Sequence, residues 1–215
     1  MYRLLRPFHN SAAGVLIAGV LISLGCGRST PSAPAASPAA AASQAAPQIV
    51  AGKDAFFAMY KAAHDWSSDV VAMRLTQKEL PGFRNEGGKA ALWEAAFASP
   101  SLHQYRVVTD SIAGIPPNIY KGVDVGPAMT WGGFTRDAMP IDVTLFTVDS
   151  DAAYQAAAAN ATEWRKKNPG KDLAALEMGQ TSKFSGPVWY VLWGTKASGF
   201  TAFVDATTGK VLPHK

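Results

Sequence analysis

The chain has 215 residues and a formal net charge of +4, with 20 Lys and Arg residues against 16 Asp and Glu residues. Arg3, Arg6 and Arg28 precede residue 50 and no acidic residue does, so the remainder of the chain is close to neutral. Nucleic-acid binding needs a clustered basic surface, and we therefore expect no nucleic acid as a partner. The single cysteine, Cys26, excludes a disulfide framework and cysteine-based metal sites from the rest of the chain.

The N-terminus has the layout of an export signal. Residues 1–10 contain Arg3 and Arg6 and no acid, and residues 11–25 are an uncharged apolar run. That run is shorter than the roughly 20 residues of a membrane-spanning helix, and it suits the apolar core of a secretory signal. We therefore predict a signal peptide over residues 1–25 and a domain that works outside the cytoplasm.

The end of the apolar run, Ile22–Cys26, resembles the bacterial lipobox, in which a small residue precedes a cysteine. The resemblance implies that Cys26 carries diacylglycerol and a fatty acid such as palmitate, which would anchor the protein to the cell envelope. Ser23 departs from the pattern, because leucine is commonest at that position. Two alternatives remain: ordinary cleavage after a run such as Ala33–Ala35, and an uncleaved anchor.

Residues 26–49 are predicted to form a disordered tether. Alanine, proline and serine dominate Gly27–Gln48, which has no large apolar side chain to bury. Such a segment cannot offset the entropy lost on ordering. Gly27, standing after the cysteine where aspartate would retain a lipoprotein, implies by the same resemblance an outer-membrane protein facing the periplasm.

The rest of the chain is predicted to be α+β, with two tandem units of one helix and a three-stranded antiparallel meander. The first unit covers residues 50–112 and the second covers 141–215. Apolar residues at helical spacing predict helices over 55–67 and 150–167, the second beginning at the capping cluster Asp149–Asp151. The predicted strands are 70–75, 92–99 and 104–110 in the first unit, and 173–178, 188–195 and 201–205 in the second.

The C-terminal part resembles the PepSY-like module, a short cystatin-like α/β unit. The resemblance rests on Pro187–Val191 and on the run Phe203–Val211, which contains Val-Asp-Ala-Thr-Thr-Gly. It covers about residues 150–212, with a fainter echo in 54–112, where Thr109–Ser111 replaces the terminal Thr-Gly. The resemblance implies an exported, non-enzymatic domain of a kind proposed to inhibit or chaperone proteases.

A Gly- and Pro-rich connection, residues 113–140, separates the two units and leads into a segment, 141–148, whose alternation predicts a further strand. Long connections of this kind are often functional. Trp131 and Phe134 lie in it between glycines. On the predicted strand 188–195, Trp189 and Trp193 share one face and Tyr190 shares the other with Leu192.

Aromatic residues are the main lead to function. We consider Trp131, Phe134, Trp189 and Trp193 as candidate partner-binding residues, with burial in the core as the competing interpretation. No nucleophile elbow, phosphate loop or metal-ligand spacing occurs, so we expect no catalytic residues, no metal and no cofactor. An enzyme would need a convergence of groups such as His64, Asp65, Glu94 and His103.

The sequence therefore predicts a non-enzymatic, lipid-anchored envelope protein that binds a protein or peptide partner. One alternative is a small-ligand carrier with a pocket between helix and sheet. Another is an accessory subunit of an envelope complex.

Overall fold

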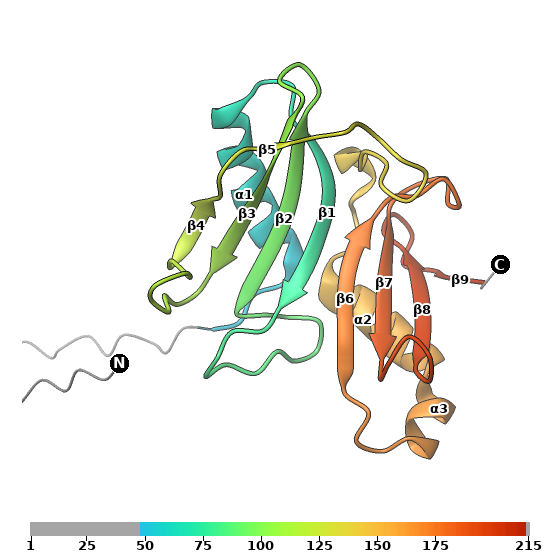
Figure 1. Cartoon of the computed structure of the whole chain (residues 1–215). Helices are drawn as coiled ribbons and strands as arrows, with labels where there is room; N and C mark the ends of the chain where they lie inside the picture. The colour runs from blue at the N-terminus through green and yellow to red at the C-terminus, as the bar shows by residue number, and fades with distance from the viewer. Residues whose placement is uncertain (1–47, 214–215) are drawn as a thin grey trace, which may run out of the picture. The chain divides into compact units, whose positions relative to one another are not determined.

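The structure, a computed structural model, describes residues 48–213, which belong to one compact unit. The predicted signal peptide, nearly all of the tether and Cys26 lie outside the described residues. The described part is mixed α+β, as expected: a nine-stranded antiparallel sheet has helices on one face and none on the other (Figure 1). The strand order is β4-β3-β2-β1-β6-β7-β8-β9, with β5 pairing with β3. None of the helices in residues 48–213 is long and apolar enough to cross a bilayer.

The first half of the described chain supplies one helix and five strands. These are α1 (Gly52–Trp66), β1 (Val71–Lys78), β2 (Leu92–Ser99), β3 (Gln104–Ser111), β4 (Gly122–Val125) and β5 (Met129–Thr130). Strand β2 has the predicted bounds, and β3 contains its predicted segment. Strand β1 begins one residue after the start of the predicted segment 70–75 and continues to Lys78. The last two strands arise from the connection 113–140, which the sequence left without regular structure.

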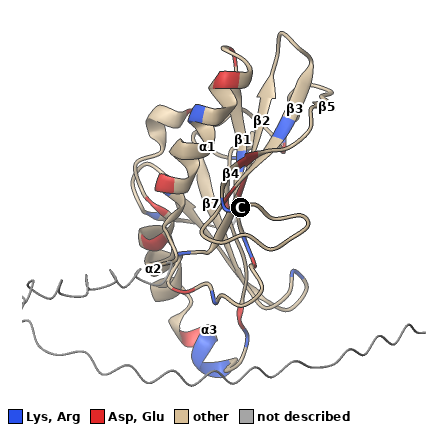
Figure 2. Cartoon of the chain, turned by 90° about the vertical axis from the view of Figure 1, so that its left-hand side faces the viewer, with Lys and Arg blue, Asp and Glu red and all other residues tan. Residues whose placement is uncertain are grey.

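The second half supplies three helical segments and four strands. These are η1 (Val143–Leu145), α2 (Ser150–Asn160), α3 (Thr162–Lys167), β6 (Leu173–Gly179), β7 (Val188–Trp193), β8 (Phe200–Asp205) and β9 (Val211–Leu212). The helix predicted over 150–167 is interrupted at Ala161, where the hydroxyl of Thr162 bonds back to the carbonyls of Ala158 and Ala159. The basic run Arg165–Lys167 ends α3 (blue in Figure 2), where cations complement the helix dipole.

The strand predicted over 141–148 is wrong. Ile141 makes a single bridge to Ala72, and the chain then turns into η1, because the carboxylate of Asp142 accepts bonds from the backbone and hydroxyl of Thr144. Phe146 leaves the turn and enters the core, where it is 2% exposed. A local side-chain turn thus overrides the alternating pattern.

The core lies between the helices and the sheet, and indole rings fill its centre. Trp93, Trp189 and Trp193 are its largest fully buried side chains, and the rings of Trp93 and Trp189 meet edge to face at 6.4 Å. Burying a ring of this size stabilises the fold by roughly 4–6 kcal/mol. Each indole N–H also needs an acceptor: Trp93 donates to the carbonyl of Val50 at 3.1 Å, and Trp189 donates to that of Val148 at 2.9 Å.

The N-termini of α1 and α2 meet beside these indoles. Ala51, which precedes α1, offers no side-chain cap. The capping groups of α1 come instead from the other half of the chain. The Ser150 hydroxyl accepts a hydrogen bond from the Gly52 amide at 2.7 Å, and the Asp149 carboxylate accepts one from the Lys53 amide at 2.8 Å. Asp149 also accepts from the Ser150 amide at 2.6 Å, so one carboxylate caps two helices.

Candidate functional site

The sheet face without helices carries a continuous row of side chains. Strand registers place residues of six strands next to one another in this row, and successive side chains of a strand alternate between faces. In sheet order the row is Thr109, Glu94, Thr76, Glu177, Tyr190 and Phe203. We call this side of the sheet the open face.

A groove of about 760 Å³ is hollowed into the open face. Arg74 lies on its floor, paired with Ala96 of β2 on one side and with Gly179 of β6 on the other. These two neighbours have almost no side chain, which leaves space on either side of the arginine. The hollow therefore lies where the first and second halves of the sheet join.

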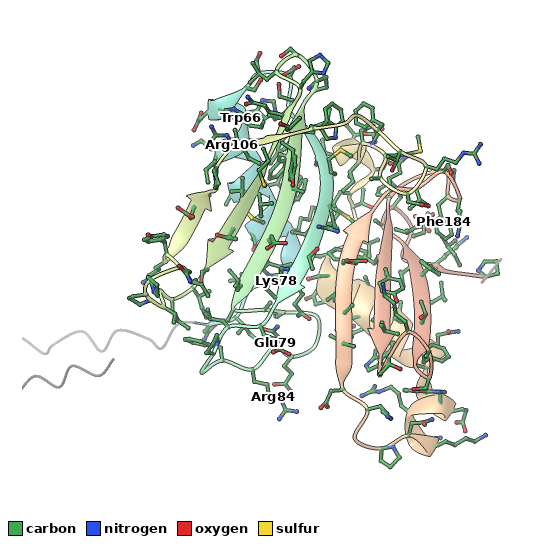
Figure 3. The ribbon with its side chains drawn as sticks, in the orientation of Figure 1. Trp66, Lys78, Glu79, Arg84, Arg106 and Phe184 are labelled. Carbon is green, nitrogen blue, oxygen red and sulfur yellow. The ribbon has the colours of Figure 1, made fainter. Side chains whose placement is uncertain are left out.

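Aromatic rings form the walls of the groove. Tyr105 and Trp131 line it on the side of the first half. On the other side, Phe203 lies 5.1 Å from Phe184 and 5.6 Å from Tyr190, measured between ring centres. Phe184 comes from the loop between β6 and β7 and is labelled in Figure 3. The walls thus offer flat apolar surfaces on both sides of a polar floor.

The connection 113–140 runs past one end of the groove and is fixed there by backbone bonds (yellow in Figure 1). The Trp131 amide donates to the carbonyl of His103 at 2.9 Å, and the Met139 amide donates to that of Gln180 at 2.9 Å. In return, the Ser182 amide donates to the carbonyl of Arg136 at 2.8 Å. The segment that carries Trp131 is therefore held in position relative to the sheet.

The polar side chains of the groove include both positively and negatively charged groups. Arg74, Lys183 and Lys196 line it together with Asp137 and Glu177. The side-chain oxygen of Gln180 is buried at its edge and finds no hydrogen-bond partner among the described residues. No group of three or more His, Cys, Asp and Glu side chains that could hold a metal ion occurs in residues 48–213. The arrangement suits recognition of an amphipathic ligand by stacking, ion pairing and hydrogen bonding.

The structure corrects two of the four candidate partner-binding residues. Trp189 and Trp193 are 0% and 1% exposed, because their strand face meets the helices. Both side chains therefore belong to the core, which was the competing interpretation, whereas Tyr190 lies on the opposite face and lines the groove. Trp131 is half-buried and lines the groove. Phe134 is 47% exposed and packs edge to face against Trp131 at 4.7 Å, but it does not line the hollow.

The groups considered for an enzyme do not converge. His64 and Asp65 lie on α1, and the His64 ring contacts that of Tyr60 at 4.6 Å. Glu94 lies on the open face, across the sheet from α1, and forms an ion pair with Lys78 at 3.1 Å. His103 lies in the turn before β3. These four side chains do not face a common hollow.

A second hollow, of about 690 Å³, lies between the β1–β2 loop and the start of β6. Lys78, Glu79 and Arg84 line it from one side (Figure 3), and Arg165 and Lys171 line it from the other. The Arg165 guanidinium stacks over the buried Trp193 ring at 5.7 Å. Charged residues line both sides of this second hollow, in contrast to the aromatic walls of the open-face groove.

Comparisons with known proteins add little to this geometry. No protein-family model matches the chain, and no curated protein matches it in sequence. A crystal structure of a candidate lipoprotein from Clostridium difficile 630 is similar over 74% of this chain and 90% of that one, with 10% identity and a TM-score of 0.47. A likeness of this degree supports no statement about function.

Proposed function

We propose that this chain is a non-enzymatic, lipid-anchored protein of the bacterial cell envelope that binds an extended segment of a protein or peptide partner in the open-face groove. The observation that carries the proposal is the pair of aromatic walls on either side of Arg74, in a hollow of about 760 Å³. Aromatic side chains give a large contact area at a small cost in conformational entropy, and they dominate binding energy at protein interfaces.

The shape of the groove favours a peptide over a small ligand. A carrier of small molecules buries most of its ligand's surface, whereas this groove is open along the sheet. The layer between helices and sheet, where the sequence suggested a ligand pocket, is packed with fully buried side chains such as Trp93, Trp189 and Phe56. An extended peptide also presents backbone N–H groups, which suit the unpaired oxygen of Gln180 at the groove's edge.

The envelope location rests on the N-terminal sequence. An apolar run over residues 11–25 that stops at Cys26 supports export and lipidation, and Gly27 supports the outer membrane facing the periplasm. More than one acyl chain is needed for stable anchoring. Lipidation predicts that the protein takes up labelled palmitate and sediments with membranes, and that Cys26→Ser abolishes both. A wild-type chain that takes up no label, or a labelled Cys26→Ser chain, would refute the anchor.

A tandem origin of the two halves belongs to the same proposal. Each half places a buried indole, Trp93 or Trp189, against the carbonyl two residues before its helix. Together with the helix-then-meander order, this supports two α-β-β-β units, the second PepSY-like. A protease-inhibitory or chaperone-like role would follow from that resemblance.

Site-specific photo-crosslinking in intact cells tests partner binding. A photoreactive phenylalanine analogue replaces Tyr190 in the groove, and a matched variant carries it in place of Phe57, which is 41% exposed on α1. We expect one defined adduct from position 190 and none from position 57. Equal crosslinking from both positions, or none from position 190, would rule out the groove as the binding site.

A second measurement separates binding from folding. Trp131→Ala removes one of the two aromatic rings of the first-half wall. Trp131 lies outside the main core cluster, so the variant should reduce the adduct at position 190 without a large fall in melting temperature. Phe134→Ala, outside the hollow, should leave the adduct unchanged. An adduct that persists in the Trp131 variant would contradict the role of that wall.

A further inference from the structure

Two of the exposed large apolar side chains, Tyr120 and Val123, lie near the end of the domain where the described chain begins. Ile49 packs onto a small cluster formed by Leu80, Ala91 and Leu92, separate from the main core. Tyr120, in the loop between β3 and β4, is 60% exposed, the highest value among the large apolar side chains that the structure describes as exposed. Val123, just beyond it, is 39% exposed.

Backbone pairs connect the start of the described chain to that loop. Val50 and Ala90 exchange two bonds of 2.9 Å, and the Ile112 amide donates to the carbonyl of Ala91 at 3.0 Å. Ile115 and Ile119 then exchange bonds of 2.8 and 3.0 Å. Tyr120 therefore directly follows a loop closed by backbone bonds, near the point where the described chain begins.

We propose that this end of the domain, with Tyr120, Lys121 and Val123 at its tip, is a membrane-contact surface that rests on the phospholipid bilayer carrying the anchor. Tyrosine is favoured at the membrane interface because its ring is apolar and its hydroxyl stays in contact with water. Lysine extends its apolar stem into the interface and keeps its ammonium group hydrated. Lys121 is exposed directly beside Tyr120.

The inference rests on the proposed lipid anchor, because a short tether then holds the domain near the bilayer and makes up for the weak affinity of a small contact surface. The 24 residues from Cys26 to Ile49 can span at most about 80 Å, at 3.3–3.6 Å per step between residues. A domain confined to that distance meets the bilayer at a high effective concentration, so a weak surface contact is enough to orient it. Lys183, on the rim of the groove, follows the C-terminal end of β6. Membrane contact through the Tyr120 tip would leave this rim available to a partner.

The test uses the lipidated full-length chain in vesicles of phosphatidylcholine and phosphatidylglycerol. Because Cys26 is the single cysteine and lipidation consumes its thiol, one engineered cysteine can carry an environment-sensitive fluorophore. Tyr120→Cys places the probe at the tip, and Phe134→Cys is the matched control, 47% exposed on the connection. We expect a blue shift and quenching by nitroxide-labelled lipid at position 120, with neither at position 134.

Three results would overturn the inference. Equal quenching at both positions would mean that the domain has no preferred orientation, and an unquenched probe at position 120 would mean that the tip does not touch lipid. Flotation of the vesicles is measured first, so that a failure of the anchor itself is seen as loss of protein from the vesicle fraction. A blue shift without lipid quenching would indicate a protein contact at the tip and would also refute the proposal.

Discussion

The most specific structural prediction concerns Asp149, whose carboxylate caps two helices that are far apart in sequence. In Asp149→Ala the amides of Ser150 and Lys53 lose their acceptor together, at bonds of 2.6 and 2.8 Å in the wild type. Loss of a capping side chain costs about 1 kcal/mol per helix, so the variant should lose about 2 kcal/mol of unfolding free energy. For a domain of this size that is a fall of roughly 4–8 °C in melting temperature.

Asp151 offers a matched control for that experiment. Its carboxylate accepts a bond from the Ala152 amide at 2.7 Å within α2 alone, at an exposed position. Asp151→Ala should therefore cost less than half as much as Asp149→Ala. The two variants are compared by thermal unfolding and by amide hydrogen exchange.

Amide hydrogen exchange tests the double capping directly, because it shows which helix loses protection. Asp149→Ala should speed exchange at Gly52 and Lys53, at the start of a helix nearly one hundred residues away, as well as at α2. Unchanged exchange at the start of α1, or equal destabilisation by the two variants, would show that Asp149 does not cap α1.

Three further predictions concern backbone fit and pH. Gly88 has a φ of +84°, and a Cβ there would lie 2.5 Å from the carbonyl oxygen of Ser150, so Gly88→Ala should lower the unfolding free energy by about 3 kcal/mol in denaturant unfolding. Gly87 also has a positive φ but has open space around it, so Gly87→Ala should lower it by about 1 kcal/mol. Equal losses in the two variants would refute the contact. Asp69 accepts hydrogen bonds from the hydroxyls of two serines and from a backbone amide, which hold its pKa well below the usual range. The stability that this carboxylate adds is present above the ordinary pKa of an aspartate and is lost as pH falls through the lowered pKa. Asp69→Asn should therefore destabilise the domain most at neutral pH, and the difference from wild type should shrink in acid. Burial raises the pKa of Asp110, so between its unfolded and folded pKa the folded state holds a proton that the unfolded state releases, and stability falls as pH rises through that range. Asp110→Asn should remove this pH dependence and stabilise the domain at neutral pH. A variant less stable than wild type at pH 7 would contradict the assignment.

Local sequence patterns predicted the strands well and the helix ends poorly. The predicted segments 92–99 and 104–110 coincide with β2 and with nearly all of β3, and α1 packs against both strands. Helix α1 begins three residues earlier than predicted, at Gly52, because its capping groups come from Asp149 and Ser150. No window of sequence around residue 52 contains that information.

The groove could be predicted only in part. Alternation along 188–193 separates Tyr190 from Trp189 and Trp193, but it does not say which face the helices cover. That choice depends on packing, and the largest side chains went to the core. The floor of the groove depends on the pairing of Arg74 with Gly179, a contact between β1 and β6 that no local pattern specifies. Phe184 reaches the wall from a loop without periodicity.

The junction of β1 with β6 has a consequence for the whole domain. It consists of three register pairs, Arg74 to Thr76 against Gly179 to Glu177, whereas β1 and β2 pair along nearly their full length. Among the six strands of the open-face row this is the shortest pairing, so we expect the two halves of the sheet to separate along this seam under mechanical or thermal stress. A ligand lying across Arg74 would fasten one half to the other, so saturation at a hundred times its dissociation constant would raise the resistance to unfolding by about 2.7 kcal/mol.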